Sequence, residues 1–207
     1  MANLLDLLQG QMDDNFLDTL SSQIGADDRQ QTATAASGIM STLVSALAKN
    51  ASTPEGAASL SNALDRDHDG SVLDNLFGML GGQVQPQNPR ALNGAGILNH
   101  LLGEQQGGAV DMISKMSGLD SSKTGNLMTM LAPMVMGLLG QQKQQQGLDV
   151  NGLTGLLTQT VTSQKQSGNP LVDMATRFLD KDGDGSMIDD IAGMVGKNLL
   201  GNLFGKR

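Results

Sequence analysis

The sequence predicts an all-α protein made of two related helical halves, each of which closes with an Asp-rich loop. Apolar residues recur at a helical period of about 3.6 along most of the chain. No run longer than about five residues alternates Val, Ile, Thr or aromatic side chains with polar ones, so no strand is expected. Similar segments recur about 92 to 94 residues apart, which indicates an internal duplication and not a solenoid of short repeats.

The duplication divides the chain into predicted halves 1–94 and 95–207. The Asp-rich loops lie about 115 residues apart, so the second half carries an insertion of roughly 20 residues. We place it at about 141–170, a segment rich in Gln, Gly and Thr that predicts a mobile linker with one short helix over 150–162. The repeated segments are LLDLLQGQ (4–11) with ILNHLLGEQ (97–105), FLDTLSSQIGADDRQ (16–30) with VDMISKMSGLDSSKT (110–124), and GIMSTLVSALAKN (38–50) with LAPMVMGLLGQQK (131–143).

Local signals predict where several helices begin and end. Thr53 before Pro54 is typical of a helix start, because the hydroxyl caps a free N–H and proline suits the first helical position. Asp27–Asp28 and Asp120–Ser122 can cap in the same way. The apolar stretch 127–140 contains a proline and is shorter than the roughly 20 residues of a membrane span, so it predicts a buried core helix. The glycines at the predicted helix ends before two of these caps are Gly25 and Gly118.

The composition argues against several classes of function. There are 13 basic and 21 acidic residues, and the net charge of -8 disfavours nucleic-acid binding. The absence of Cys excludes disulfides, thiolate catalysis and Cys-based metal sites. We predict no enzyme, because Trp and Tyr are absent and the two histidines lack catalytic partners in the sequence. His68 occupies a non-ligand position of the first Asp-rich loop, which predicts a solvent-facing side chain, and His100 lies on an amphipathic helix.

The two Asp-rich loops, 65–76 and 180–191, share the pattern DxDxDGSx(L/I)D. Hard cations such as Ca²⁺ take about six to eight oxygen ligands, and alternate carboxylates on a tight turn bring three of them to one point. Without a cation, carboxylates this close would repel one another. The predicted ligands are Asp65, Asp67, Asp69, Ser71 through its backbone carbonyl, and Asp74 in the first loop, and Asp180, Asp182, Asp184, Ser186 through its carbonyl, and Asp189 in the second.

Over their first seven positions these loops resemble the calcium loop of EF-hand proteins, and they then depart from it. Position twelve holds Leu76 and Ile191 where an EF-hand has a bidentate Glu. The closing carboxylate at position ten makes the loops similar to the shortened DxDxDGxxxD/E loops of bacterial calcium modules. Because Asp is shorter than Glu, we expect a weak dissociation constant of about 10⁻⁴ to 10⁻³ M. Ca²⁺ is the expected ion and Mg²⁺ the other candidate.

The N-terminal part of the chain resembles a known family. The segments NLLDLLQGQ, GAD before an apolar helix that ends in ALAKNAS, and TPEGAASLSNALDRDHDGSVLDNL are similar to the bacterial YidB-like family, called domain of unknown function 937. The resemblance covers roughly residues 1–140, and the second Asp-rich loop with its tail looks like an extra or diverged copy. It implies a bacterial helical protein and supplies no catalytic residues, because the family has no assigned activity.

The favoured function is a calcium-binding helical protein whose ions brace helix pairs. The alternative is a helical self-assembly or protein-interaction module, supported by the 13 Met residues and the Gly-rich helices, with a second copy or an unknown protein as partner. Membrane-surface binding through the tail 194–207 is less favoured, because the tail has only three cations on an acidic protein. No signal peptide is recognised, so cytoplasmic localisation is the default, with export by another route left open.

Overall fold

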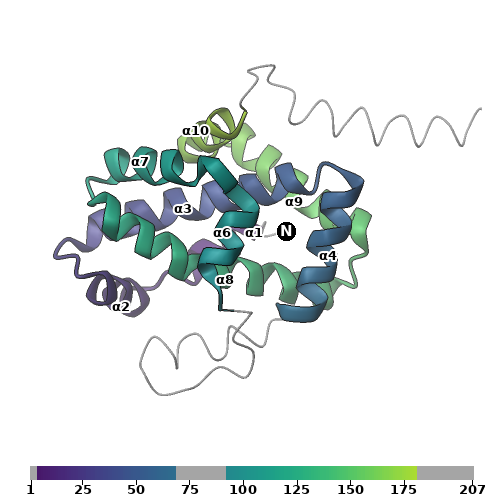
Figure 1. Ribbon diagram of the computed structural model, residues 1–207, viewed down its shortest axis with the longest axis horizontal. Helices are drawn as coiled ribbons and strands as arrows, with labels where there is room; N and C mark the ends of the chain where they lie inside the picture. The colour runs from purple at the N-terminus through teal and green to yellow at the C-terminus, as the bar shows by residue number, and fades with distance from the viewer. Residues whose placement is uncertain (1–3, 69–91, 181–207) are drawn as a thin grey trace, which may run out of the picture.

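Helices account for nearly all of residues 4–68 and 92–180, the part of the chain that the computed structural model describes (Figure 1). No strand occurs in these two ranges, so the predicted all-α class is confirmed for them. The elements in chain order are α1 (Leu4–Gly10), α2 (Asp14–Ile24), α3 (Arg29–Asn50), α4 (Pro54–Asp67), α6 (Gly94–Leu102), the 3₁₀ turn η1 (Gly103–Gln105), α7 (Gln106–Ser117), α8 (Ser121–Gln146), α9 (Val150–Gln166) and α10 (Pro170–Leu179).

The helix starts and ends that local signals predict are confirmed. The Thr53 hydroxyl accepts a hydrogen bond from the Gly56 N–H at 3.1 Å, and α4 begins at Pro54. Asp28 caps α3 and Asp120 caps α8, and each carboxylate accepts bonds from two backbone N–H groups of the first turn. The glycines that end α2 and α7 have left-handed backbones, with φ of 65° at Gly25 and 75° at Gly118.

The core surrounds α3, which is buried on all sides along most of its length. Figure 1 shows α3 running through the middle of the bundle, and it packs against α7, α8 and α10. The hydroxyls of Ser41 and Thr42 are also buried there, and each donates to the carbonyl four residues earlier in the helix. The hydroxyls of Ser41 and Thr42 are thereby satisfied inside the core, whereas the buried Ser45 hydroxyl of the same helix has no hydrogen-bond partner among the described residues. The fully buried side chains of α3 include Ile39, Met40, Leu43 and Leu47.

The second long helix, α8, contains the predicted core stretch 127–140 and carries Pro133 in its interior. Proline has no N–H, so the Thr129 carbonyl receives no helical hydrogen bond from it. Gly94, the first residue of α6, lies directly against that carbonyl: a Cβ at this position would be 1.9 Å from the Thr129 oxygen. A residue without a side chain is therefore required where α6 meets α8. No helix in the described ranges is both long and apolar enough to cross a membrane.

The prediction of a mobile linker at 141–170 is wrong. The helix α8 continues to Gln146, and α9 extends four residues beyond the short helix expected over 150–162. Leu153 and Leu157 are completely buried and Val161 nearly so. These residues lie four positions apart and form an apolar stripe that packs α9 against α3, α4 and α10. Because the residues between these positions are rich in Gln, Gly and Thr, the composition of the segment does not indicate the apolar stripe.

The order of the helices is similar before and after the undescribed segment 69–91. The helices α1, α2 and α3 begin at residues 4, 14 and 29, and α6, α7 and α8 begin at residues 94, 106 and 121. The helices that lead into the two Asp-rich loops, α4 and α10, both begin with a proline behind a capping side chain, Thr53 and Asn169 respectively. The helix α9 lies between α8 and α10 and has no counterpart between α3 and α4.

Candidate cation sites at the ends of α4 and α10

Both Asp-rich loops begin at the C-terminal end of a helix. The predicted first loop, 65–76, starts too early: Asp65 and Asp67 lie in the last turn of α4, and the chain leaves the helix only at His68. Asp180 directly follows α10, and its N–H donates to the Thr176 carbonyl at 2.9 Å. Helix C-termini carry free carbonyl groups and a partial negative charge, and both attract cations. The other predicted ligands, Asp69, Ser71, Asp74, Asp182, Asp184, Ser186 and Asp189, lie outside the described residues.

A lysine from another helix pairs with the first aspartate of the first loop. Lys143 lies in the last turn of α8, and its Nζ donates to Oδ1 of Asp65. The Lys143 side chain is only 11% exposed, whereas the Asp65 side chain is 54% exposed. The Lys143 ammonium group is thus largely buried at the C-terminal end of α4, whereas the Asp65 carboxylate is exposed to solvent.

A second lysine reaches the end of α10 in a similar way. Lys49 lies in the last turn of α3, and its Nζ donates to the backbone carbonyl of Leu179, the residue before Asp180. Each helix that leads into an Asp-rich loop therefore receives a lysine from the end of a long helix. The pairing is crossed: α3 supplies the cation for α10, and α8 supplies it for α4.

The crossed lysines follow from how the helices pack. The helix α10 lies against α3, and α4 lies against α8 and α9. In Figure 1, α10 lies along the upper edge of the bundle and α4 runs to its lower edge, so the two helix ends are well separated. The described carboxylates thus belong to two separate candidate sites. Across the described ranges, no three His, Asp or Glu residues gather into a group that could hold a metal ion.

The donor set at both ends suits a hard cation. The described candidates are carboxylates, Asp65 and Asp67 at α4 and Asp180 at α10, and carboxylate oxygens favour Ca²⁺ and Mg²⁺. The described part provides two such residues at one end and one at the other. A full coordination shell requires the undescribed residues that follow.

The prediction that His68 faces solvent is wrong. Its side chain is 4% exposed and lines a cavity of about 200 Å³ between α4 and α6. Leu60 and Ile97 line the same cavity, as do Met136 of α8 and His100. The loop pattern placed His68 between two ligand positions, whereas α4 packs against α8 and α9, and the imidazole at its end is buried beside the cavity that α4 and α6 line.

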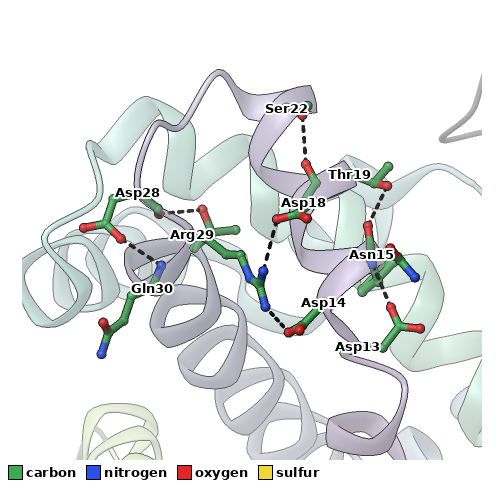
Figure 2. A network of polar contacts seen from close by, with 11 residues as sticks. Asp13, Asp14, Asn15, Asp18, Thr19, Ser22, Asp28, Arg29 and Gln30 are labelled. Atoms are coloured by element: carbon green, nitrogen blue, oxygen red, sulfur yellow. Dashed lines mark hydrogen bonds and ion pairs between the residues drawn. The ribbon is translucent and has the colours of Figure 1, made fainter.

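Clustered aspartates elsewhere in the protein have structural partners, as Figure 2 shows for the starts of α2 and α3. Asp13 caps α2 by accepting from the Phe16 N–H at 2.7 Å, and Asp28 caps α3. Arg29 pairs with Asp14 and, at 3.5 Å, with Asp18. Capping and ion pairing account for this acidic cluster. A high density of aspartate is therefore no sign of a metal site in this protein without the alternating spacing of the two loops.

Sequence reasoning missed both lysines. Each is a cation in the last turn of a helix, a common position that complements the helix dipole of its own helix. Nothing in the local sequence of Lys49 or Lys143 indicates that the side chain reaches a different helix. The contacts join residues 130 and 78 positions apart in the chain.

The sequence profile described as "Bacterial protein of unknown function (DUF937)" matches residues 6–142 and 143–207. The two matches together span nearly all of the chain. The protein belongs to this family. The resemblance found in the sequence is confirmed, and the family's match extends past residue 140 to include the second Asp-rich loop. Membership supplies no ligand and no reaction. Neither a curated protein nor a solved structure matches the chain.

Proposed function

We propose that this protein binds calcium at the loops 65–76 and 180–191, where the ions brace pairs of helices without catalysis. The observation that carries the proposal is that both DxDxDG patterns begin at helix C-termini that already attract a cation. Lys143 lies at one end and Lys49 at the other. Negative electrostatic potential stabilises a lysine ammonium group and would also attract a divalent cation. Both helix ends are therefore electrostatically suited to bind a divalent cation.

The proposal includes an internal duplication, with related halves 1–94 and 95–207. It is supported by the similar order of helices α1 to α3 and α6 to α8, and by the two matches to the family profile. In this view the ends of α4 and α10 are equivalent positions. The two loops would then bind the same kind of ion by the same residues.

The first ion would be held by Asp65, Asp67 and the downstream residues of the loop, and the second by Asp180 and its downstream residues. Carboxylates in alternation supply hard oxygen donors and neutralise the ion's charge. An ion bound in this way ties the end of α4 or α10 to the segment that follows it. Because the loops close with Asp, we expect dissociation constants of about 10⁻⁴ to 10⁻³ M, with Mg²⁺ as a competitor.

Isothermal titration calorimetry of the full chain with calcium tests the proposal. We expect two binding events per chain, and a gain in unfolding free energy of about 1.4 kcal/mol per site when free calcium is ten times the dissociation constant. The double variant Asp67→Asn with Asp69→Asn should lose one event. The double variant Asp182→Asn with Asp184→Asn should lose the other.

The matched control is Asp27→Asn with Asp111→Asn, which removes the same charge from exposed positions outside the two loop sequences. It should keep both binding events. Absence of heat and of any change in melting temperature up to about 10 mM calcium, well above the expected dissociation constants, would contradict the proposal.

The alternative of a self-assembly module gains no support from the described surface. Among the residues described, the large apolar side chain that is exposed is Met174, at 37%. Several methionines instead fill the core, as expected in a protein with few aromatic residues. The buried methionines are Met40, Met128, Met134 and Met136.

Static light scattering over a range of protein concentrations, with and without calcium, distinguishes a self-assembly module from a calcium-binding protein.

A further inference from the structure

We propose that the cavity of about 200 Å³ between α4 and α6 binds a small neutral aromatic molecule that carries one hydroxyl or amide group. Three helices supply its walls, with Ala63 on α4, Ile97 on α6 and Met136 on α8. This binding does not depend on calcium, because it concerns the walls between helices and not the carboxylates of the Asp-rich loops.

The volume of the cavity sets the size of the ligand. A cavity of about 150 Å³ with Leu, Ile and Phe walls, engineered into another protein, binds benzene. The cavity of this protein is larger, at about 200 Å³. It therefore has room for one aromatic ring with a small substituent.

The walls of the cavity are mostly apolar and suit the ring. Leu60 and Met136 are buried, and Ala63, Ile97 and Leu101 are half-buried. Such side chains give water few hydrogen-bond partners, so an apolar ring that replaces water between them is stabilised by the hydrophobic effect. The thioether of Met136 adds a favourable contact with an aromatic ring.

The mouth of the cavity provides hydrogen-bonding groups. Asn93, Gly96 and His100 line the cavity and are exposed, so it opens to solvent beside α6. The Oδ1 atom of Asn93 accepts from the Gly96 N–H at 3.0 Å and caps α6, so the group that Asn93 offers to a ligand is its Nδ2 donor. The imidazole of His100 can donate or accept a hydrogen bond. A hydroxyl or amide on the ring matches both groups.

The charge of the protein favours a neutral ligand over an anionic one. The described residues that line the cavity include neither Lys nor Arg, and the chain has a net charge of -8. A carboxylate would lose its hydration there without gaining a lysine or arginine partner. A neutral hydroxyl or amide loses much less free energy on leaving water.

The test titrates the full chain with phenol, benzene and benzoate. Because the chain contains no Tyr or Trp, the fluorescence of phenol reports its binding without a protein background, and the other two compounds are measured by competition. We expect a dissociation constant of about 10⁻⁴ to 10⁻³ M for phenol, as suits a ligand of this size. Benzene should bind about three- to ten-fold more weakly, because it makes no hydrogen bond at the mouth. Benzoate should bind at least about ten-fold more weakly than phenol.

A variant that fills the cavity locates the binding site. Ala63→Leu adds three carbon atoms to a wall of the cavity and should weaken phenol binding at least about ten-fold. The matched control Ala58→Leu makes the same change at an exposed position of α4 and should leave the affinity unchanged. Thermal unfolding followed by circular dichroism checks that both variants fold.

A second measurement uses the unmodified protein, so it holds even if Ala63→Leu does not fold. The methyl signal of Met136 should shift in NMR spectra as phenol is added, because this side chain lines the cavity. The methyl signal of Met174, which is exposed on α10, should stay fixed.

Each contrary result overturns a stated part of the proposal. Absence of phenol binding up to about 10 mM, well above the expected dissociation constant, overturns it entirely. Equal phenol affinity in folded Ala63→Leu and Ala58→Leu, or a fixed Met136 signal, shows that phenol does not bind in this cavity. Benzoate binding as tight as that of phenol overturns the neutral class of ligand, and benzene binding as tight as that of phenol overturns the role of the mouth.

Discussion

Replacing Leu157 with alanine is expected to lower the free energy of unfolding by about 2–5 kcal/mol. Leu157 is completely buried in α9, which packs against α3, α4 and α10. Truncation removes apolar contacts and leaves a cavity that these surrounding helices cannot easily fill. Urea-induced unfolding followed by circular dichroism measures the change.

The control for this prediction is Gln159→Ala in the same helix. Gln159 is exposed, so its replacement should change the unfolding free energy by no more than about 0.5 kcal/mol. The two variants also test whether α9 packs into the core or is part of the linker predicted at 141–170, because a linker would tolerate both substitutions equally. Similar small effects of Leu157→Ala and Gln159→Ala would show that α9 does not pack into the core.

Replacing Gly94 with alanine is expected to lower the free energy of unfolding by about 2–4 kcal/mol. The added Cβ would lie 1.9 Å from the Thr129 carbonyl oxygen. The backbone fixes the position of the Cβ, and the Thr129 oxygen is itself a backbone atom, so no change of side-chain rotamer relieves the clash and α6 must move away from α8. That movement would loosen the packing of Leu98 and Leu102, which are buried. Thermal and urea unfolding measure the loss.

Gly155→Ala is the matched control, because it makes the same chemical change inside another helix. A Cβ at Gly155 would meet nothing within 4 Å, and the residue is exposed. Alanine is favoured over glycine in a helix interior by up to about 1 kcal/mol, so this variant should be slightly more stable than the unmodified protein. A gain in stability for Gly94→Ala as well would contradict the close approach of α6 to Thr129.

The candidate sites were only partly predictable from the sequence. The alternating carboxylates predicted two Asp-rich loops, and the structure shows that Asp65, Asp67 and Asp180 lie at the C-terminal ends of two helices. The cationic partners were not predictable, because Lys49 and Lys143 reach these ends from helices far away in the chain. The spacing of residues within a loop describes that loop and carries no information on which distant side chain packs against it.

The sequence alone determined the helical class and several helix boundaries, because caps and left-handed glycines act within a few residues of one another. Asp28, Asp120 and Gly118 are examples that the structure confirms. Only the tertiary structure decided that α9 enters the core, that His68 turns inward and that α10 packs on α3. These features depend on contacts between distant segments, and shape complementarity among whole helices selects those contacts.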